Sequence, residues 1–97
     1  MLEEMRVIEV FGEKPVERYR INLYQASPKQ RDYFLGKFLR LEEGNCLPAR
    51  ISGSETIYSL PIIEAFRFPQ DNRIVYITQN STFILEARGV NLTDYLA

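Results

Sequence analysis

Arginine and tyrosine are the side chains through which this chain could do chemistry, because the commoner catalytic residues are missing from it. The sequence of 97 residues contains no histidine and one cysteine, Cys46. Ser-His-Asp and Cys-His catalytic groups, and zinc sites made of histidine and cysteine, are therefore excluded. Cys46 follows the expected end of a helix, where the helix dipole disfavours a thiolate. We interpret it as a buried or half-buried filler rather than a nucleophile.

Four arginines and two tyrosines lie on or beside the strands expected in the second half of the chain. They are Arg50, Tyr58, Arg67, Arg73, Tyr76 and Arg88. Arginine donates paired hydrogen bonds to phosphate, and tyrosine can stack on a base, so a sheet face with both would suit RNA. Arginine is also common at strand ends, and tyrosine is a usual half-buried strand residue. We therefore treat these six residues as candidate contacts to a protein partner or to RNA.

The carboxylates and glycines form no recognisable catalytic, metal-binding or nucleotide-binding motif. No Asp-x-Asp or EF-hand spacing occurs, and the five glycines are scattered rather than grouped in a phosphate-binding loop. A pair of catalytic carboxylates needs a fixed separation that the spacing along the chain does not give. We therefore expect no metal and no cofactor, and we favour a protein without catalytic residues.

The overall composition is that of a single small domain, residues 1–97, with 90–97 as a loosely ordered tail. Hydrophobic residues make up 45% of the chain and charged residues 26%, which is ordinary for a soluble protein. The net charge of −1 argues against a dedicated nucleic-acid binder. There is no signal-like start and no apolar run near the length of about 20 residues that spans a bilayer. With one cysteine there is no internal disulfide. We expect a cytoplasmic protein that does not contact membranes.

One helix is clearly indicated, over about residues 28–43. Ser27 and Gln30 have the spacing of a capping box, and Pro28 suits the first helical position. Gly44 is placed to end the helix in a left-handed conformation. Gly36 lies in the middle of the helix, where glycine is unfavourable, and we expect close packing against a strand there. The apolar stripe of this helix consists of Phe34, Leu35, Phe38, Leu39 and Leu41.

The rest of the chain reads as strands. Residues 6–11 and 18–24 predict an antiparallel hairpin, with Tyr19, Ile21 and Leu23 on the core side. Further strands are expected at 49–52, 56–60, 62–68, 73–78 and 82–88, with Pro48 as a break and Pro61 as an edge, a bulge or a break. The run 73–78 is apolar on both faces, which favours a strand covered on both sides. Asn91 can cap one helical turn. We predict an α+β fold of β-β-α-β-β-β order, with one main helix packed on a mostly antiparallel sheet.

Part of this order resembles the RelE/HigB-type toxins, which are small RNA-cleaving proteins. The resemblance covers half of the chain, in Leu41-Glu42-Glu43-Gly44, the strand–turn–strand segment 51–60, Arg73-Ile74-Val75-Tyr76 and Phe83-Ile84-Leu85. It implies an RNA-directed activity in which Arg73 and Tyr76 take part. The chain departs from the family in having two strands before a single helix and in lacking a strong positive charge. Apart from Arg88, it also lacks the basic or histidine residues expected after the last strand.

Two functional hypotheses follow. The first is a non-enzymatic interaction domain that binds another protein or a second copy of itself as a homodimer. It is based on the missing catalytic groups and on strands whose edges have little protection beyond proline. The alternative is an RNA-acting domain of the toxin-like kind.

Overall fold

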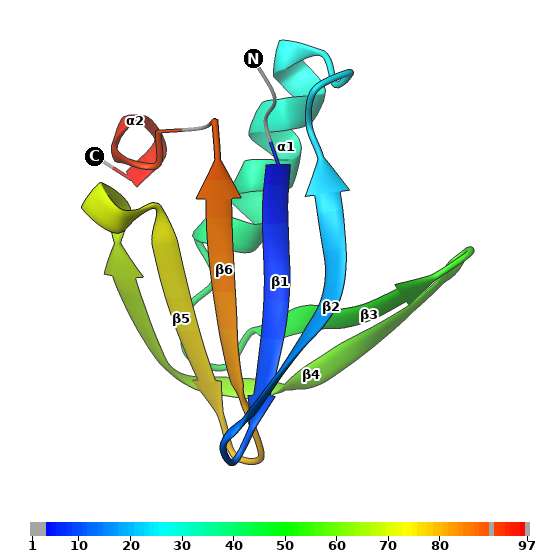
Figure 1. Ribbon diagram of the computed structural model, residues 1–97, viewed down its shortest axis with the longest axis vertical. Helices are drawn as coiled ribbons and strands as arrows, with labels where there is room; N and C mark the ends of the chain where they lie inside the picture. The colour runs from blue at the N-terminus through cyan, green and yellow to red at the C-terminus, as the bar shows by residue number, and fades with distance from the viewer. Residues whose placement is uncertain (1–3, 90, 97) are drawn as a thin grey trace.

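The computed structural model describes residues 4–89 and 91–96 and confirms the α+β class. Six strands and two helices follow one another in the chain, with a short 3-10 turn before the fifth strand (Figure 1). The elements are β1 (Glu4–Phe11), β2 (Lys14–Asn22), α1 (Pro28–Leu39), β3 (Cys46–Ser52), β4 (Glu55–Phe68), η1 (Pro69–Asp71), β5 (Arg73–Thr78), β6 (Thr82–Arg88) and α2 (Thr93–Leu96). Among the described residues, no helix is long and apolar enough to cross a membrane.

The strands form one antiparallel sheet in the order β2-β1-β6-β5-β4-β3. Strand β4 is unusually long, and its two halves have different neighbours. Its first half pairs with β3, whereas its second half, from Ile62 onward, pairs with β5. The hairpin of β3 with the first half of β4 therefore reaches away from the body of the sheet, as Figure 1 shows. We call residues 46–61 the arm.

The hydrophobic core lies between α1 and the inner face of the sheet. From α1 it takes Leu35, Phe38 and Leu39, and the loop residue Leu23 is also buried. The predicted alternation of Tyr19, Ile21 and Leu23 is confirmed, since the first two pack against this core. The sheet contributes the inward residues of its central strands, Met5, Val7, Ile74, Tyr76, Phe83 and Leu85. The elements around the helix are thus held by burial of apolar surface.

The start of α1 agrees with the prediction, but its end does not. The Ser27 hydroxyl accepts from the Gln30 amide at 3.2 Å, and the Gln30 side chain accepts from the Ser27 amide at 3.0 Å. The helix ends at Leu39 rather than near residue 43. Gly44 is left-handed, with φ of 91°, but it lies beyond the helix and its N–H donates to the Ile62 carbonyl at 2.8 Å. The helix stops early because side chains from the sheet bind its last main-chain groups.

The break expected at Pro48 was wrong, and of the edge, bulge or break expected at Pro61 the break does not occur. Pro48 lies within β3 opposite Tyr58, and Pro61 lies within β4 opposite Cys46. The ladder shifts register on both sides of Pro48, and such irregularities let a strand continue past a residue that cannot donate.

Strand β5 is central, as expected, but it is covered on one face only. Its inner residues Ile74 and Tyr76 are buried, whereas Val75 and Ile77 on the outer face are half-buried. No described helix lies over this outer face in Figure 1.

The C-terminal segment forms the expected helical turn. The Asn91 side chain accepts from the Thr93 amide at 3.1 Å, and α2 follows. Leu92 is buried in the core, and the Leu92 amide donates to the Asn72 side chain at 3.1 Å. Residues 91–96 are thereby attached to the turn before β5.

Candidate functional site

Arg67 and Tyr76 lie together, but they hold the end of α1 rather than an open site. The Arg67 side chain donates to the carbonyls of Leu39 and Leu41, the first at 2.9 Å. The Tyr76 hydroxyl donates to the Phe38 carbonyl and accepts from the Leu41 amide at 3.3 Å. The Arg67 guanidinium also lies 5.9 Å from the centre of the Tyr76 ring. Since Tyr76 is fully buried, it cannot contact a partner, and the pair serves as a C-terminal cap made of side chains.

Arg73 and Arg88 lie on the outer face of the sheet, away from that cap. Arg73 is 3.9 Å from the Glu86 carboxylate, and Arg88 is opposite Glu4 on β1. Arg73 and Tyr76 are three residues apart on one strand, so their side chains point to opposite faces. The two positions that carry over from the toxin resemblance are therefore not brought together.

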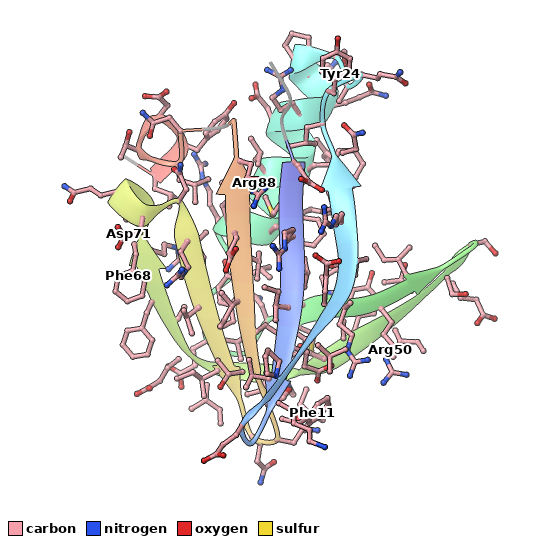
Figure 2. All side chains as sticks on the ribbon, in the orientation of Figure 1. Phe11, Tyr24, Arg50, Phe68, Asp71 and Arg88 are labelled. Atoms are coloured by element: carbon pink, nitrogen blue, oxygen red, sulfur yellow. The ribbon has the colours of Figure 1, made fainter. Side chains whose placement is uncertain are left out.

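Arg50 and Tyr58 belong to the arm, and they border a cleft of about 270 Å³. The cleft lies between the arm and the ends of β1 and β6, where Glu9, Phe11 and Ser81 also line it. Tyr58 is 59% exposed, and Figure 2 shows Arg50 projecting from the arm. The six sequence candidates thus divide among three separate places, the arm, the end of α1 and the outer face of the sheet.

Glu9 and Arg18 form a buried ion pair at this cleft that the sequence analysis missed. Glu9 is 6% exposed, and its carboxylate accepts from Arg18 Nε at 2.8 Å. The Arg18 guanidinium also lies 5.5 Å from the centre of the Phe11 ring. Glu9 interrupts the apolar run Val7-Ile8-Glu9-Val10, which was the available signal for an inward-facing charge.

The rest of the arm is open to solvent. Every residue from 50 to 58 is exposed, although this segment carries Ile51, Ile57 and Tyr58. Ile57 is 56% exposed, and Leu60, nearer the body, is 44% exposed. A two-stranded hairpin is marginally stable alone, so a surface of this kind is typical of an interaction site.

Only the root of the arm is fixed to the body. Leu47 and Ala49 are buried there, and the Tyr19 hydroxyl donates to the Pro48 carbonyl at 2.6 Å. Cys46, which was expected to be buried or half-buried, is exposed at this root. The chain therefore presents the apolar part of the arm on a well-anchored base.

Gly36 lines a different hollow, between α1 and α2, and the expected close packing against a strand is wrong. A methyl group built at Gly36 would meet no atom within 4 Å. The hollow has a volume of about 380 Å³ and is bordered by Asp32, Arg40, Asp94 and Tyr95. The Arg40 side chain donates to the Tyr95 carbonyl at 3.1 Å and so joins the two helices.

Replacing Gly36 with alanine is expected to raise the free energy of unfolding by about 0.5–1 kcal/mol, because alanine favours helix and has room here. Urea unfolding followed by circular dichroism measures the change. Gly44→Ala is the control and should lower the stability by about 1–2 kcal/mol, because the φ of 91° disfavours a side chain. A loss of stability in Gly36→Ala would contradict the open geometry.

No metal-binding group is formed within residues 4–89 and 91–96, since no three His, Cys, Asp or Glu side chains converge there. The chain was also compared with family models, with curated proteins and with solved structures, and none of the three comparisons gives a significant match.

Proposed function

We propose that this protein is a non-enzymatic interaction domain that associates with a second copy of itself through the arm. The observation that carries the proposal is the exposure of the arm from residue 50 to residue 58, which includes three large apolar side chains. Covering them in an interface would remove apolar surface from water, at about 25 cal/mol per Å². This is a larger gain than any polar contact of the arm offers.

A second copy suits the arm for reasons of geometry and charge. In a two-fold dimer, each arm meets the same surface on its partner, so the apolar side chains cover one another. The arm carries one charge of each sign, Arg50 and Glu55, so two crossing arms present opposite as well as like charges to each other. Aromatic and aliphatic anchors such as Tyr58 and Ile57 are typical of the centre of an interface.

An RNA-acting domain is the alternative, and the arrangement of the arginines supports it less. Arg67 is engaged with the end of α1, and Arg73 lies 3.9 Å from Glu86. Arg50 and Arg88 lie on the arm and on the outer face respectively, so the four candidate arginines do not form one phosphate-binding stripe. Binding to RNA would weaken steeply as the salt concentration is raised, whereas self-association through buried apolar side chains would not.

The proposal is tested by removing the apolar anchors of the arm. The double substitution Ile57→Ser with Tyr58→Ser is expected to weaken self-association at least tenfold, which is about 1.4 kcal/mol. The free energy of unfolding of the monomer should change by no more than about 0.5 kcal/mol, because both side chains are exposed. Sedimentation velocity over a range of protein concentrations measures the first quantity.

The matched control is the double substitution Tyr24→Ser with Tyr33→Ser. These side chains are 58% and 60% exposed, close to the values for the arm, but they lie in the β2–α1 loop and on α1. The control should associate as the unaltered protein does. Equal weakening in both double variants would sink the assignment to the arm, because general loss of surface apolarity would then explain it.

A further inference from the structure

The second half of β4 has a free edge that is distinct from the exposed face of the arm. The Ala87 amide donates to the Asn72 carbonyl at 2.9 Å, and the Thr78 amide donates to the Ser81 carbonyl at 2.9 Å. These bonds fix which residues of β5 turn their main chain toward β6, because the direction alternates along a strand. Arg73, Val75 and Ile77 therefore turn theirs toward β4.

The same alternation determines which main-chain groups of β4 have no partner in β5. Glu64, Phe66 and Phe68 lie opposite Ile77, Val75 and Arg73, so their main-chain groups bond to β5.

The main-chain groups of Ala65 and Arg67 consequently point away from the sheet. Ile62, at the start of this edge, is paired with Gly44 and Asn45, but the chain then diverges from β4. The edge of β4 after Ile62 is therefore free to pair with an added strand, in the position that β3 occupies along the first half of β4.

A groove of about 380 Å³ runs along this free edge. Glu42 and Glu43 form one wall, and residues 63–67 of β4 form the other. Arg67 turns its side chain to the carbonyls of Leu39 and Leu41, which places the segment after α1 on the inner side of the groove. The positive charge of Arg67 is thereby directed into the helix end. The wall formed by Glu42 and Glu43 is negatively charged.

The outer side of the same edge is apolar apart from Glu64, which lies opposite Ile77. Phe66, Val75, Ile84 and Ile8 lie opposite one another in register across four strands. Phe66 and Phe68 are each 45% exposed, and Figure 2 shows Phe68 at the margin of the sheet. An added strand would therefore place alternate side chains against glutamates on one face and against phenylalanines on the other.

We infer that this edge binds an extended segment of another protein in which lysine or arginine alternates with apolar residues. The main chain of the segment pairs with Ala65 and Arg67, its basic side chains face Glu42 and Glu43, and its apolar side chains extend the row that begins at Phe66. A second copy of this chain is a poor occupant, because two-fold pairing of β4 edges would bring both sets of glutamates together. The inference goes beyond self-association through the arm and does not depend on it.

The test uses a capped peptide that alternates lysine and valine, titrated into the isotopically labelled protein. The amide signals of Ala65 and Arg67 are expected to shift and to become protected from hydrogen exchange. A capped peptide that alternates glutamate and valine should bind at least tenfold more weakly. Equal binding of the two peptides, or absence of shifts at these amides up to millimolar peptide, would overturn the inference.

Two variants sharpen the test. Ala65→Pro removes an N–H that points away from β5, so it should block the peptide while keeping the β4–β5 bonds. Glu42→Lys with Glu43→Lys reverses the charge of the groove wall and should weaken peptide binding at least tenfold. This variant tests the inference even if the proline variant fails to fold. The matched control is Glu13→Lys with Glu55→Lys, two exposed positions, the first in the β1–β2 turn and the second at the start of β4 in the arm. An equal loss of peptide binding in that control would count against the groove as the binding site. The arm variant Ile57→Ser with Tyr58→Ser should bind the peptide as the unaltered protein does.

Discussion

Replacing Glu9 with alanine is expected to lower the free energy of unfolding by about 2–4 kcal/mol, because Arg18 then loses its partner in a poorly solvated place. The two side chains are 8% and 18% exposed, and they are joined at 2.8 Å. Breaking a buried ion pair by removing one member is costly, since the remaining charge stays desolvated. The partial exposure of Arg18 keeps the expected loss below that of a fully buried pair. Urea unfolding of the variant measures the loss.

The matched control is Glu86→Ala on β6. Its ion pair with Arg73 is 3.9 Å long, and the side chains are 34% and 50% exposed, so the expected loss is no more than about 1 kcal/mol. The double substitution Glu9→Leu with Arg18→Leu should recover much of the stability, because it leaves neither charge unpaired. If Glu9→Ala costs no more than Glu86→Ala, then burial of this ion pair does not matter for stability.

Replacing Tyr76 with phenylalanine is expected to cost about 1–3 kcal/mol, although the ring is retained. The hydroxyl bonds both the Phe38 carbonyl and the Leu41 amide, and these groups would lose a buried partner. Tyr58→Phe is the control, since that side chain is 59% exposed, and it should change the stability by no more than about 0.5 kcal/mol. Equal stability of the two variants would show that the side-chain cap of α1 contributes little.

The tyrosines also give this protein a pH dependence at the alkaline end. Burial raises the pKa of the Tyr76 hydroxyl and of the Tyr19 hydroxyl. A tyrosine with a raised pKa in the folded state contributes stability below the ordinary value of about 10, and the contribution is lost as the pH rises above it. Tyr76→Phe should therefore lose less stability than the unaltered protein between pH 9 and pH 11, which are about one unit either side of that value.

Local signals predicted most of the fold correctly. The capping box of Ser27 and Gln30 located the start of α1, and period-2 alternation placed Tyr19 and Ile21 toward the core. Both features depend on residues close together in the chain. The end of α1 was missed because Arg67 and Tyr76 cap it from strands far along the sequence. A contact of this range leaves no trace in local spacing.

The candidate site was harder to predict for the same reason. The sequence offered one set of six residues, Arg50, Tyr58, Arg67, Arg73, Tyr76 and Arg88. The sheet places Arg50 and Tyr58 on the arm, Arg67 and Tyr76 at the end of α1, and Arg73 and Arg88 on the outer face. Pro61 suggested an edge, a bulge or a break, and β4 continues through it and so projects the arm. Which side of β4 stays open depends on strand order, and strand order is decided by long-range pairing.

Both proposals assign the contacts with a partner to β4. Its first half displays apolar side chains, and its second half displays an open edge. Proline and lysine are residues that commonly protect a strand edge against unwanted pairing, and neither occurs between residues 62 and 68. An edge that is kept free in this way is consistent with a partner that covers it.

The most direct test of self-association is the mass of the unaltered protein in solution. Sedimentation equilibrium at micromolar concentrations should give twice the chain mass of 11.4 kDa, with little change as salt is raised, and dilution should return the monomer. A mass of one chain at every concentration up to the millimolar range would contradict the account, because the exposed arm would then need no second copy.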